Sequence, residues 1–232
     1  MKPFAYLDNW HIDQPPTRFE TALERTGLPV RVYKTNRGEF PESTEFCGVF
    51  IGPSKSGAYD DEPWIHREHG LLQALGKAAV PMLGLCFGSQ ILASALVGRD
   101  QVFKRPDRET GYADIEMTAA GLDDPLTAKF SSTVRTFHWH GDEVRAEHPD
   151  VVVLARNPAC GNQIWRWGRG PVWGIQPHPE MDRGQICEFL EKNRAWFQSE
   201  GKDVDTMIKS AEDNTELSPV FDRFLEIVRA AA

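Results

Sequence analysis

Cys86 is the residue in this chain whose surroundings are best suited to chemistry. It lies in the segment GLCFGSQ at 84–90, between a short apolar run and the helix-like run at 91–96. A strand that turns sharply into a helix strains the residue at its tip and leaves room only for small residues two positions either side. Gly84 and Gly88 meet this requirement. The pattern predicts a nucleophile elbow, with Cys86 at a helix N-terminus, where backbone N–H groups and the helix dipole favour the thiolate.

A cysteine nucleophile needs a base, and the base needs a third group to orient it. The segment QPHPE at 176–180 offers both. Its two prolines exclude a helix, so the chain is extended and residues two apart project to the same side. Glu180 is then expected to contact one imidazole nitrogen of His178 while the other faces Cys86. A lone His-Pro-Glu is more often a surface turn, but the elbow earlier in the chain favours a Cys86, His178, Glu180 triad.

Short apolar runs alternate with helical stretches along the chain, which indicates an α/β fold with a central, mostly parallel sheet. Strands are expected at 4–7, 30–33, 46–51, 79–83, 134–137, 151–155, 162–167 and 172–176, the last two as a hairpin around 168–170. Helices are expected at 18–26, 63–77, 91–96 and 220–230. We expect one catalytic domain over residues 1–200 and a C-terminal helical extension at 201–232 that packs on it. The elbow should lie at the carboxyl end of a parallel strand.

Composition limits the classes of partner. The 232 residues carry a net charge of −8, which argues against nucleic acid or an anionic membrane as the main partner. The N-terminal segment reaches Asp8 and Asn9 too early for the apolar core of a signal peptide, and no run is long enough to span a bilayer. We therefore expect a soluble, cytoplasmic protein that acts on small molecules or proteins. The four cysteines lack metal or redox spacing and are too few for a disulfide scaffold.

A competing motif is the histidine pair His138 and His140, followed by Asp142. Both imidazoles would lie on one side of an extended strand, as at the start of some metallohydrolase motifs. A metal-dependent hydrolase using these three residues is therefore an alternative function. His66 and His69, three apart on a predicted helix, are more simply a solvated helix face than an ion site. Because the elbow explains the chain without a metal, neither metal nor cofactor is expected.

On these motifs the chain resembles the class I glutamine amidotransferases, whose triad runs Cys, His, Glu in chain order. The family's elbow is matched at 84–90 and its histidine-glutamate signature at 174–180. The segment 51–57, rich in glycine and proline, resembles the family's oxyanion loop. Segments 59–64 and 140–144 resemble stand-alone relatives of the amidotransferase domain of GMP synthase most closely. The resemblance implies a flavodoxin-like, three-layer α/β sandwich.

The resemblance also implies a mechanism and roles for further residues. The cysteine attacks the side-chain amide of glutamine, or of another γ-glutamyl compound, and forms a γ-glutamyl thioester that water hydrolyses, releasing ammonia for an acceptor. The backbone N–H groups of Gly52 and Phe87 are implied as the oxyanion hole. Gln90 and the backbone around His140 and Gly141 are implied to bind the substrate.

Besides the metal-dependent hydrolase, three functions remain open at this point. Amidotransferases usually pass ammonia to a synthase domain, and none is recognisable in these residues. The chain is then either a glutaminase subunit that docks on a separate synthase or a stand-alone γ-glutamyl hydrolase or peptidase. The third function is that of a catalytically silent binding or regulatory protein. The complete triad argues against this last alternative.

Overall fold

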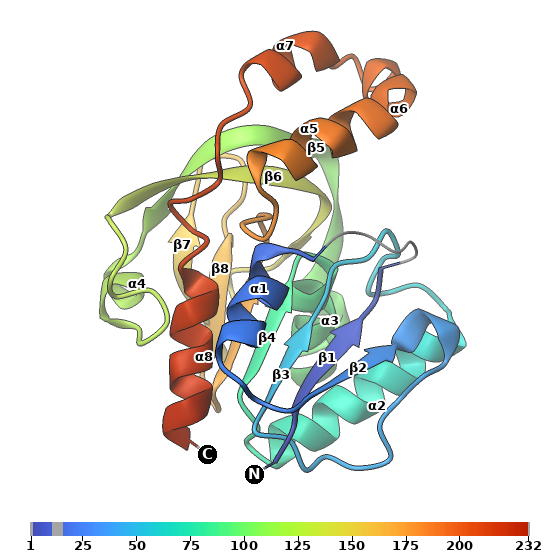
Figure 1. Ribbon diagram of the computed structural model, residues 1–232, viewed down its shortest axis with the longest axis vertical. Coiled ribbons are helices and arrows are strands. Elements are labelled where there is room, and N and C mark those ends of the chain that lie inside the picture. The colour runs from blue at the N-terminus through green and yellow to red at the C-terminus, as the bar shows by residue number, and fades with distance from the viewer. Residues whose placement is uncertain (1, 11–15, 232) are drawn as a thin grey trace.

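The computed structural model describes residues 2–10 and 16–231, and within them nine strands form a single mixed sheet (Figure 1). Their order across the sheet is β2-β1-β3-β4-β9-β8-β7-β5-β6. Neighbouring strands are parallel from β2 to β9 and antiparallel from β9 to β6. The strands are β1 (Phe4–Asp8), β2 (Val30–Lys34), β3 (Gly48–Ile51), β4 (Met82–Leu85), β5 (Val102–Met117), β6 (Thr133–Val144), β7 (Val151–Arg156), β8 (Ile164–Trp167) and β9 (Val172–Ile175).

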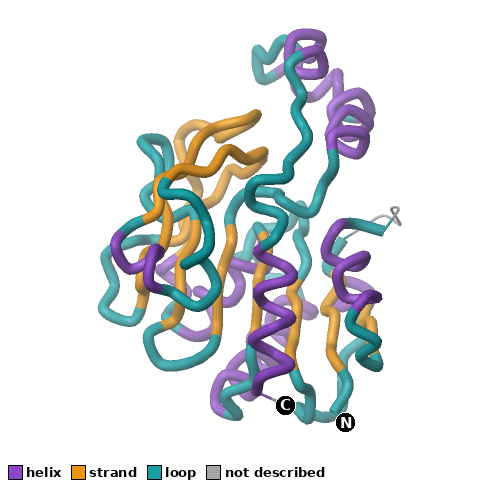
Figure 2. The backbone as a smooth tube through the Cα atoms, turned by 60° about the vertical axis from the view of Figure 1, so that its left-hand side comes forward, coloured by secondary structure: helices purple, strands orange, loops and turns teal. Residues whose placement is uncertain are grey.

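Helices cover both faces of the sheet, which confirms the three-layer α/β architecture. Figures 1 and 2 show α1 and α8 on one face, α2 and α3 on the other, and α5, α6 and α7 beyond the end to which β1 and β3 point. None of the helices in the described residues combines the length and apolar character needed to cross a membrane. The helices are α1 (Arg18–Arg25), α2 (Pro63–Lys77), α3 (Phe87–Leu96), α4 (Ala119–Asp123), α5 (Arg183–Lys192), α6 (Arg194–Ser199), α7 (Val204–Lys209) and α8 (Val220–Ala231).

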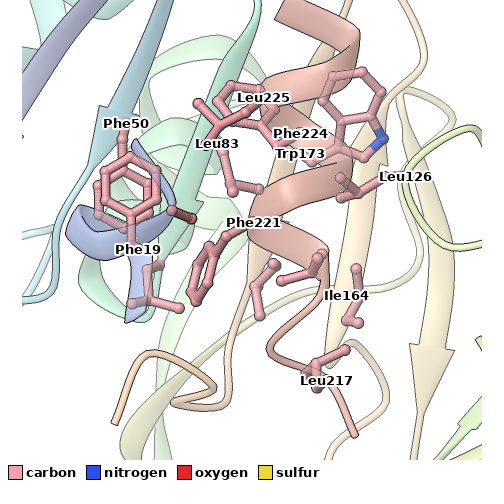
Figure 3. Close-up of a cluster of buried hydrophobic side chains, with 14 of the residues drawn as sticks. Phe19, Phe50, Leu83, Leu126, Ile164, Trp173, Leu217, Phe221, Phe224 and Leu225 are labelled. Carbon is pink, nitrogen blue, oxygen red and sulfur yellow. The ribbon is translucent and has the colours of Figure 1, made fainter. Parts of the chain in front are cut away.

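Successive side chains of each parallel strand point to opposite faces of the sheet, and this divides the core into two layers. In β1, Phe4 joins the cluster under α1 and α8, whereas Ala5 joins the cluster under α2 and α3. Figure 3 shows aromatic rings filling the first layer, where Phe19 stacks on Phe50 with ring centroids 3.6 Å apart. Each fully buried ring of this kind contributes about 1.5–3 kcal/mol relative to an exposed one. This packing fixes the parallel strands, and with them the loops at their carboxyl ends.

The antiparallel half contains β5, a long strand absent from the expected elements. β5 pairs with β6 from Val102 opposite Val144 to Glu116 opposite Thr133, with a register shift between Lys104 and Glu109. Residues 104–111 of β5 are mostly polar and largely solvent-accessible, so no apolar alternation marks them in the sequence. β6 is likewise longer than the expected strand at 134–137. The hairpin of β8 and β9 around residues 168–170 is confirmed.

The C-terminal segment contacts both the core and the loop after β9. Phe221 and Phe224 of α8 are fully buried among the rings of the first layer. Asn214 is 1% exposed and donates a hydrogen bond of 2.5 Å from its Nδ2 to the carbonyl of His178. Arg18 of α1 forms an ion pair with Asp213. These contacts support the proposal that residues 201–232 pack on the catalytic domain.

Candidate active site

Cys86 joins β4 to α3 in a conformation that is rare for a residue with a side chain. Its φ is +50° and its ψ is −107°. A Cβ atom on Gly84 would lie 2.3 Å from the carbonyl oxygen of Gly88, and one on Gly88 would lie 2.1 Å from that of Ile51. Both contacts are with backbone, so neither position accepts a larger residue without a shift of the chain. The predicted elbow geometry is therefore present, with the tip held by a hydrogen bond of 2.7 Å from its N–H to the carbonyl of Ile175.

The loop after β9 carries His178 and Glu180, both buried. His178 Nδ1 lies 2.7 Å from Glu180 Oε1, the predicted contact, although Pro179 and Glu180 form a turn and not the extended segment that was expected. The other ring nitrogen, Nε2, is buried and has no hydrogen-bond partner among the described residues. Burial lowers the pKa of His178, but the charges of Glu180 and Cys86 outweigh it and hold the pKa well above its usual value. A protonated imidazole beside Cys86 at neutral pH is the state that this arrangement favours.

The Cys86 side chain opens into a crevice of about 530 Å³. Cys86 is 7% exposed, and this crevice gives small molecules access to its thiol. Trp139 and Trp196 form an aromatic wall, and three cationic side chains lie around the space: Lys55, Lys104 and Arg108. The crevice therefore combines a nucleophile with groups able to bind an anion.

The structure corrects the predicted oxyanion hole. The N–H of Gly52 donates a hydrogen bond of 2.9 Å to the carbonyl of Leu7, because β3 continues its parallel pairing with β1 for one more residue. It is not free to receive an oxyanion, so the prediction for Gly52 is wrong in this arrangement. Phe87 is the first residue of α3, where backbone N–H groups have no partner within the helix. The backbone N–H of Phe87 remains the candidate donor to the oxyanion.

Gln90 lines the crevice, but its amide nitrogen is used within the protein. Its Nε2 donates to Gln176 Oε1 at 3.1 Å and to the carbonyl of Asp142 at 3.4 Å. These bonds join the first turn of α3 to the end of β9 and to β6. The predicted role of Gln90 in substrate binding stays a prediction, now limited to its side-chain oxygen.

His140 and Gly141 also lie at the crevice, as expected, and Gly141 has a specific reason to lack a side chain. A Cβ atom there would lie 2.9 Å from the guanidinium carbon of Arg108. That guanidinium lies over the Trp196 ring at 5.1 Å and near Trp139 at 6.0 Å. Sequence reasoning missed Arg108 because it belongs to the polar part of β5, and no local motif marks it.

The structure does not group His138, His140 and Asp142, the residues of the alternative metal-dependent function, as one set of ligands. The Asp142 carboxylate instead accepts a hydrogen bond of 3.0 Å from the Tyr59 hydroxyl. Glu109 of β5 faces the histidines, with Oε1 3.7 Å from His138 Nδ1 and Oε2 2.9 Å from His140 Nε2. Because β5 was not predicted, no sequence pattern placed Glu109 beside the two histidines.

The pKa values of Glu109 and His138 in this cluster are shifted far from their usual values. Burial raises the pKa of Glu109, but the hydrogen bonds from His140 and Asn157 and the charge of His138 outweigh it and hold the pKa at about 2. Burial lowers the pKa of His138 to about 4. The carboxylate is therefore ionised and the His138 imidazole neutral at physiological pH.

Comparison with known proteins identifies the family of this chain. A family model described as glutamine amidotransferase class-I matches residues 17–195. A putative glutamine amidotransferase-like protein, YfeJ of Salmonella typhimurium, is 34% identical over 146 residues, which cover 61% of this chain and 59% of that protein. A gamma-glutamyl-L-1-hydroxyisopropylamide hydrolase of Pseudomonas sp is 29% identical over 160 residues, which cover 67% of this chain and 54% of the hydrolase.

Two further comparisons concern a component of GMP synthase and a solved structure. A glutamine-hydrolyzing GMP synthase subunit of Halobacterium salinarum is 32% identical over 114 residues, 49% of this chain and 60% of that protein. The chain thus spans about half to three fifths of the length of these curated relatives. The crystal structure of a glutamine amidotransferase from Thermotoga maritima shares the fold, with a TM-score of 0.82, 22% identity, and coverage of 98% of this chain and 97% of that one. Since the family model covers most of its length, this chain belongs to the class I glutamine amidotransferase family.

Proposed function

We propose that this chain hydrolyses the side-chain amide of glutamine or of another γ-glutamyl compound through Cys86, His178 and Glu180. The observation that carries the proposal is the placement of Cys86 at a strained elbow that opens into the crevice, beside a buried and oriented imidazole. The elbow places Cys86 at the wall of the crevice, and the raised pKa of His178 favours an imidazolium that stabilises a thiolate.

The reaction then proceeds in two steps. The Cys86 thiolate attacks the amide carbonyl, and the N–H of Phe87 stabilises the oxyanion by about 3 kcal/mol. The carbon–nitrogen bond breaks as His178 gives its proton to the departing nitrogen, which leaves as ammonia or an amine. Water then attacks the γ-glutamyl thioester and transfers a proton to His178, releasing glutamate and restoring the thiolate. Glu180 keeps the imidazole in the required orientation.

The crevice supplies a site for the amino-acid end of the substrate. Arg108 contacts the indole rings of Trp139 and Trp196, and Gly141 leaves space for its guanidinium. A guanidinium binds a carboxylate through two parallel hydrogen bonds. Arg108 is therefore our candidate for the residue that binds the α-carboxylate of the glutamyl group.

A cavity beside the triad favours a stand-alone γ-glutamyl hydrolase as a second candidate function. The cavity, of about 180 Å³, borders His178 and Glu180 and shares Lys55, Trp139 and Asn193 with the crevice. Its wall is largely apolar and includes Tyr6, Trp10, Phe50, Phe137, Met181 and Phe189. Because His178 protonates the leaving nitrogen, an apolar substituent on that nitrogen would extend into this space. The Pseudomonas relative is named for the hydrolysis of a γ-glutamyl hydroxyisopropylamide, an amide that carries a short hydroxyalkyl substituent on its nitrogen.

The alternative is a glutaminase subunit with a separate partner. The Halobacterium relative is named as one subunit of a GMP synthase, so a separate synthase that consumes the ammonia is the corresponding partner for this chain. A glutaminase of this kind is expected to turn over glutamine slowly until the synthase binds.

Covalent labelling tests the nucleophile directly. The purified chain is incubated with a diazoketone analogue of glutamine and its intact mass is measured. We expect one label on the wild type, none on Cys86→Ala, and one on the matched control Cys187→Ala, whose thiol is the most accessible of the four. An unlabelled wild type, or a labelled Cys86→Ala variant, would contradict the proposed function and would favour a catalytically silent protein.

A substrate panel then separates the two candidates. Glutamate release is measured from glutamine and from γ-glutamyl amides with apolar substituents on the nitrogen, without any added partner. The hydrolase predicts faster release from the substituted amides, and Phe189→Asp should reduce that preference by placing a charge in the cavity. Slow release from every compound would support the synthase-dependent glutaminase.

A further inference from the structure

Glu109, His138 and His140 form a buried cluster that the proposed hydrolysis does not use. In the β5–β6 pairing Glu109 lies directly opposite His140, and His138 projects from the same face two residues earlier. Both histidine side chains are 0% exposed and the Glu109 side chain is 8% exposed. One nitrogen from each ring and one carboxylate oxygen all lie within 4.8 Å of one another.

The hydrogen bond that His140 makes through Nδ1 determines what its other ring nitrogen, Nε2, presents to Glu109. Its Nδ1 lies 2.9 Å from the carbonyl oxygen of Asp142, which can only accept, so Nδ1 carries a hydrogen. A neutral imidazole has a single N–H, so the lone pair of Nε2 would then face Glu109 Oε2 at 2.9 Å. Two lone pairs at this distance require a cation between them, either a second proton on His140 or a metal ion.

His138 distinguishes these two possibilities. Both of its ring nitrogens are buried and lack a hydrogen-bond partner among the residues that the structure describes. The backbone of Ala113 interacts with the ring, but not in hydrogen-bonding geometry. The distance of 3.7 Å from Nδ1 to Glu109 Oε1 is too long for a hydrogen bond. It is close to the spacing of two ligands of one ion, which lie roughly 3.0–3.6 Å apart when each is about 2.1 Å from the metal and the angle between them is about 90–120°. The 2.9 Å between His140 Nε2 and Glu109 Oε2 is close to the short end of this range. A second proton on His140 would leave His138 without a partner, whereas a metal accounts for both rings.

The groups around Glu109 hold the carboxylate in place as metal-binding carboxylates are commonly held. Asn157 Nδ2 donates to Oε1 at 2.7 Å, and Gln163 Nε2 donates to Oε2 at 2.9 Å. Each carboxylate oxygen accepts two hydrogen bonds or ligands, so one position on each remains directed at the histidines.

We propose that Glu109, His138 and His140 bind one divalent transition-metal ion of the class of Zn²⁺. Two imidazoles and one carboxylate suit Zn²⁺ and related first-row ions and disfavour Mg²⁺ and Ca²⁺, which require mainly oxygen ligands. The ion joins β5 to β6 behind the crevice wall that carries Arg108. Its role is to fix that wall, and Cys86 needs no metal for the chemistry proposed above.

Cobalt titration tests the site without reference to activity. The wild-type chain is freed of metal with a chelator, the chelator is removed, and Co²⁺ is added while its visible absorption is recorded. We expect one equivalent to bind with the strong bands of a low-coordinate nitrogen and oxygen site, and Zn²⁺ to displace it. Glu109→Gln and His138→Gln should each weaken binding at least about 100-fold.

Two controls identify the ligands. His66→Gln removes an exposed histidine that contacts Asp61, and Asp142→Asn changes the carboxylate that contacts Tyr59. Both variants should bind Co²⁺ as the wild type does. Stoichiometric binding that survives in Glu109→Gln, or that is lost in His66→Gln, would overturn the assignment.

A measurement on the wild type avoids any dependence on how the buried variants fold. Micromolar Zn²⁺ should raise the melting temperature of the metal-free chain, and a chelator should reverse the change, because a ligand that binds only the folded state stabilises it. A wild type that binds no Co²⁺ and shows no Zn²⁺-dependent melting shift would overturn the proposal. The cluster would then be an ion pair between a doubly protonated His140 and Glu109. Neither outcome bears on the labelling of Cys86.

Discussion

The two halves of the sheet differ in the way that they contribute to the site. The parallel half, from β2 to β9, consists of short strands, largely buried, and presents Cys86 and His178 at the ends of β4 and β9. The antiparallel half, from β8 to β6, includes the longest strands, and its partly exposed β5–β6 pair supplies Arg108 and Trp139. The groups proposed to react therefore come from local turns beside a buried core, whereas those proposed to surround the substrate come from long-range strand register. This comparison predicts that changes in the first half affect rate or folding, and changes in the second affect binding.

The largest effect is expected from Glu180→Gln, at the junction of the two halves. Without the carboxylate, burial lowers the pKa of His178, since Glu180 is the main group that raises it. A group with a raised pKa keeps its proton until the pH passes that value, so the alkaline limb of kcat/KM should move to lower pH. We expect kcat to fall about 10³-fold. A pH–rate profile checks both, and an unmoved alkaline limb would contradict the role assigned to Glu180.

Gly88→Ala tests the rigidity of the parallel half. The new Cβ would lie 2.1 Å from the carbonyl oxygen of Ile51. Because that oxygen belongs to the backbone of a buried strand, it cannot move aside easily, and we expect a loss of about 3 kcal/mol in unfolding free energy. Gly70→Ala is the matched control in α2, where a Cβ meets nothing within 4 Å, and it should stabilise by about 0.5–1 kcal/mol. Chemical denaturation of both variants measures the difference. Equal stabilities would show that the elbow backbone adapts more readily than the packing indicates.

Glu68 gives the parallel half a characteristic pH dependence, which Glu68→Gln should remove. Burial raises the pKa of Glu68 to about 8, against hydrogen bonds from Asn9 and Thr35 that lower it. The folded chain therefore keeps a proton that the unfolded chain has lost, and stability falls as the pH rises from about 4.5 to 8. Between pH 5 and pH 7 this amounts to about 2 kcal/mol, which the glutamine variant should not lose. Denaturation at both pH values tests this, with Glu24→Gln on the exposed face of α1 as the control; a parallel decline in both variants would refute it.

Arg108→Gln should have the smallest effect, and mainly on binding. Loss of the guanidinium removes the proposed carboxylate contact, so KM should rise about 10-fold while kcat changes little. Arg145→Gln is the control from the same half, because its guanidinium lies over Phe103 at 4.7 Å and does not line the crevice. Steady-state kinetics on the best substrate of the panel would measure both. A fall in kcat at constant KM would assign Arg108 to the reaction rather than to recognition.

Features set by neighbouring residues were predictable from the sequence. The helix at Pro63–Lys77 has the predicted bounds because proline favours the first turn of a helix. The glycines around Cys86 follow from the turn itself. β5 was missed because its polar residues are held by pairing with β6, and Glu109 was missed with it. The free N–H expected at Gly52 was wrong for a similar reason, since pairing with β1 extends further than the resemblance implies.

The bond from Asn214 to the carbonyl of His178 has a consequence for protein synthesis. The loop that holds the imidazole is fastened by a residue 36 positions further along the chain, and α8 then closes the core behind it. While the chain is still emerging from the ribosome, Cys86 and His178 are present before Asn214 has been added, so the hydrogen bond to the carbonyl of His178 is missing. The loop around His178 should therefore reach its final conformation only after Asn214 and α8 have been synthesised and have packed against the sheet.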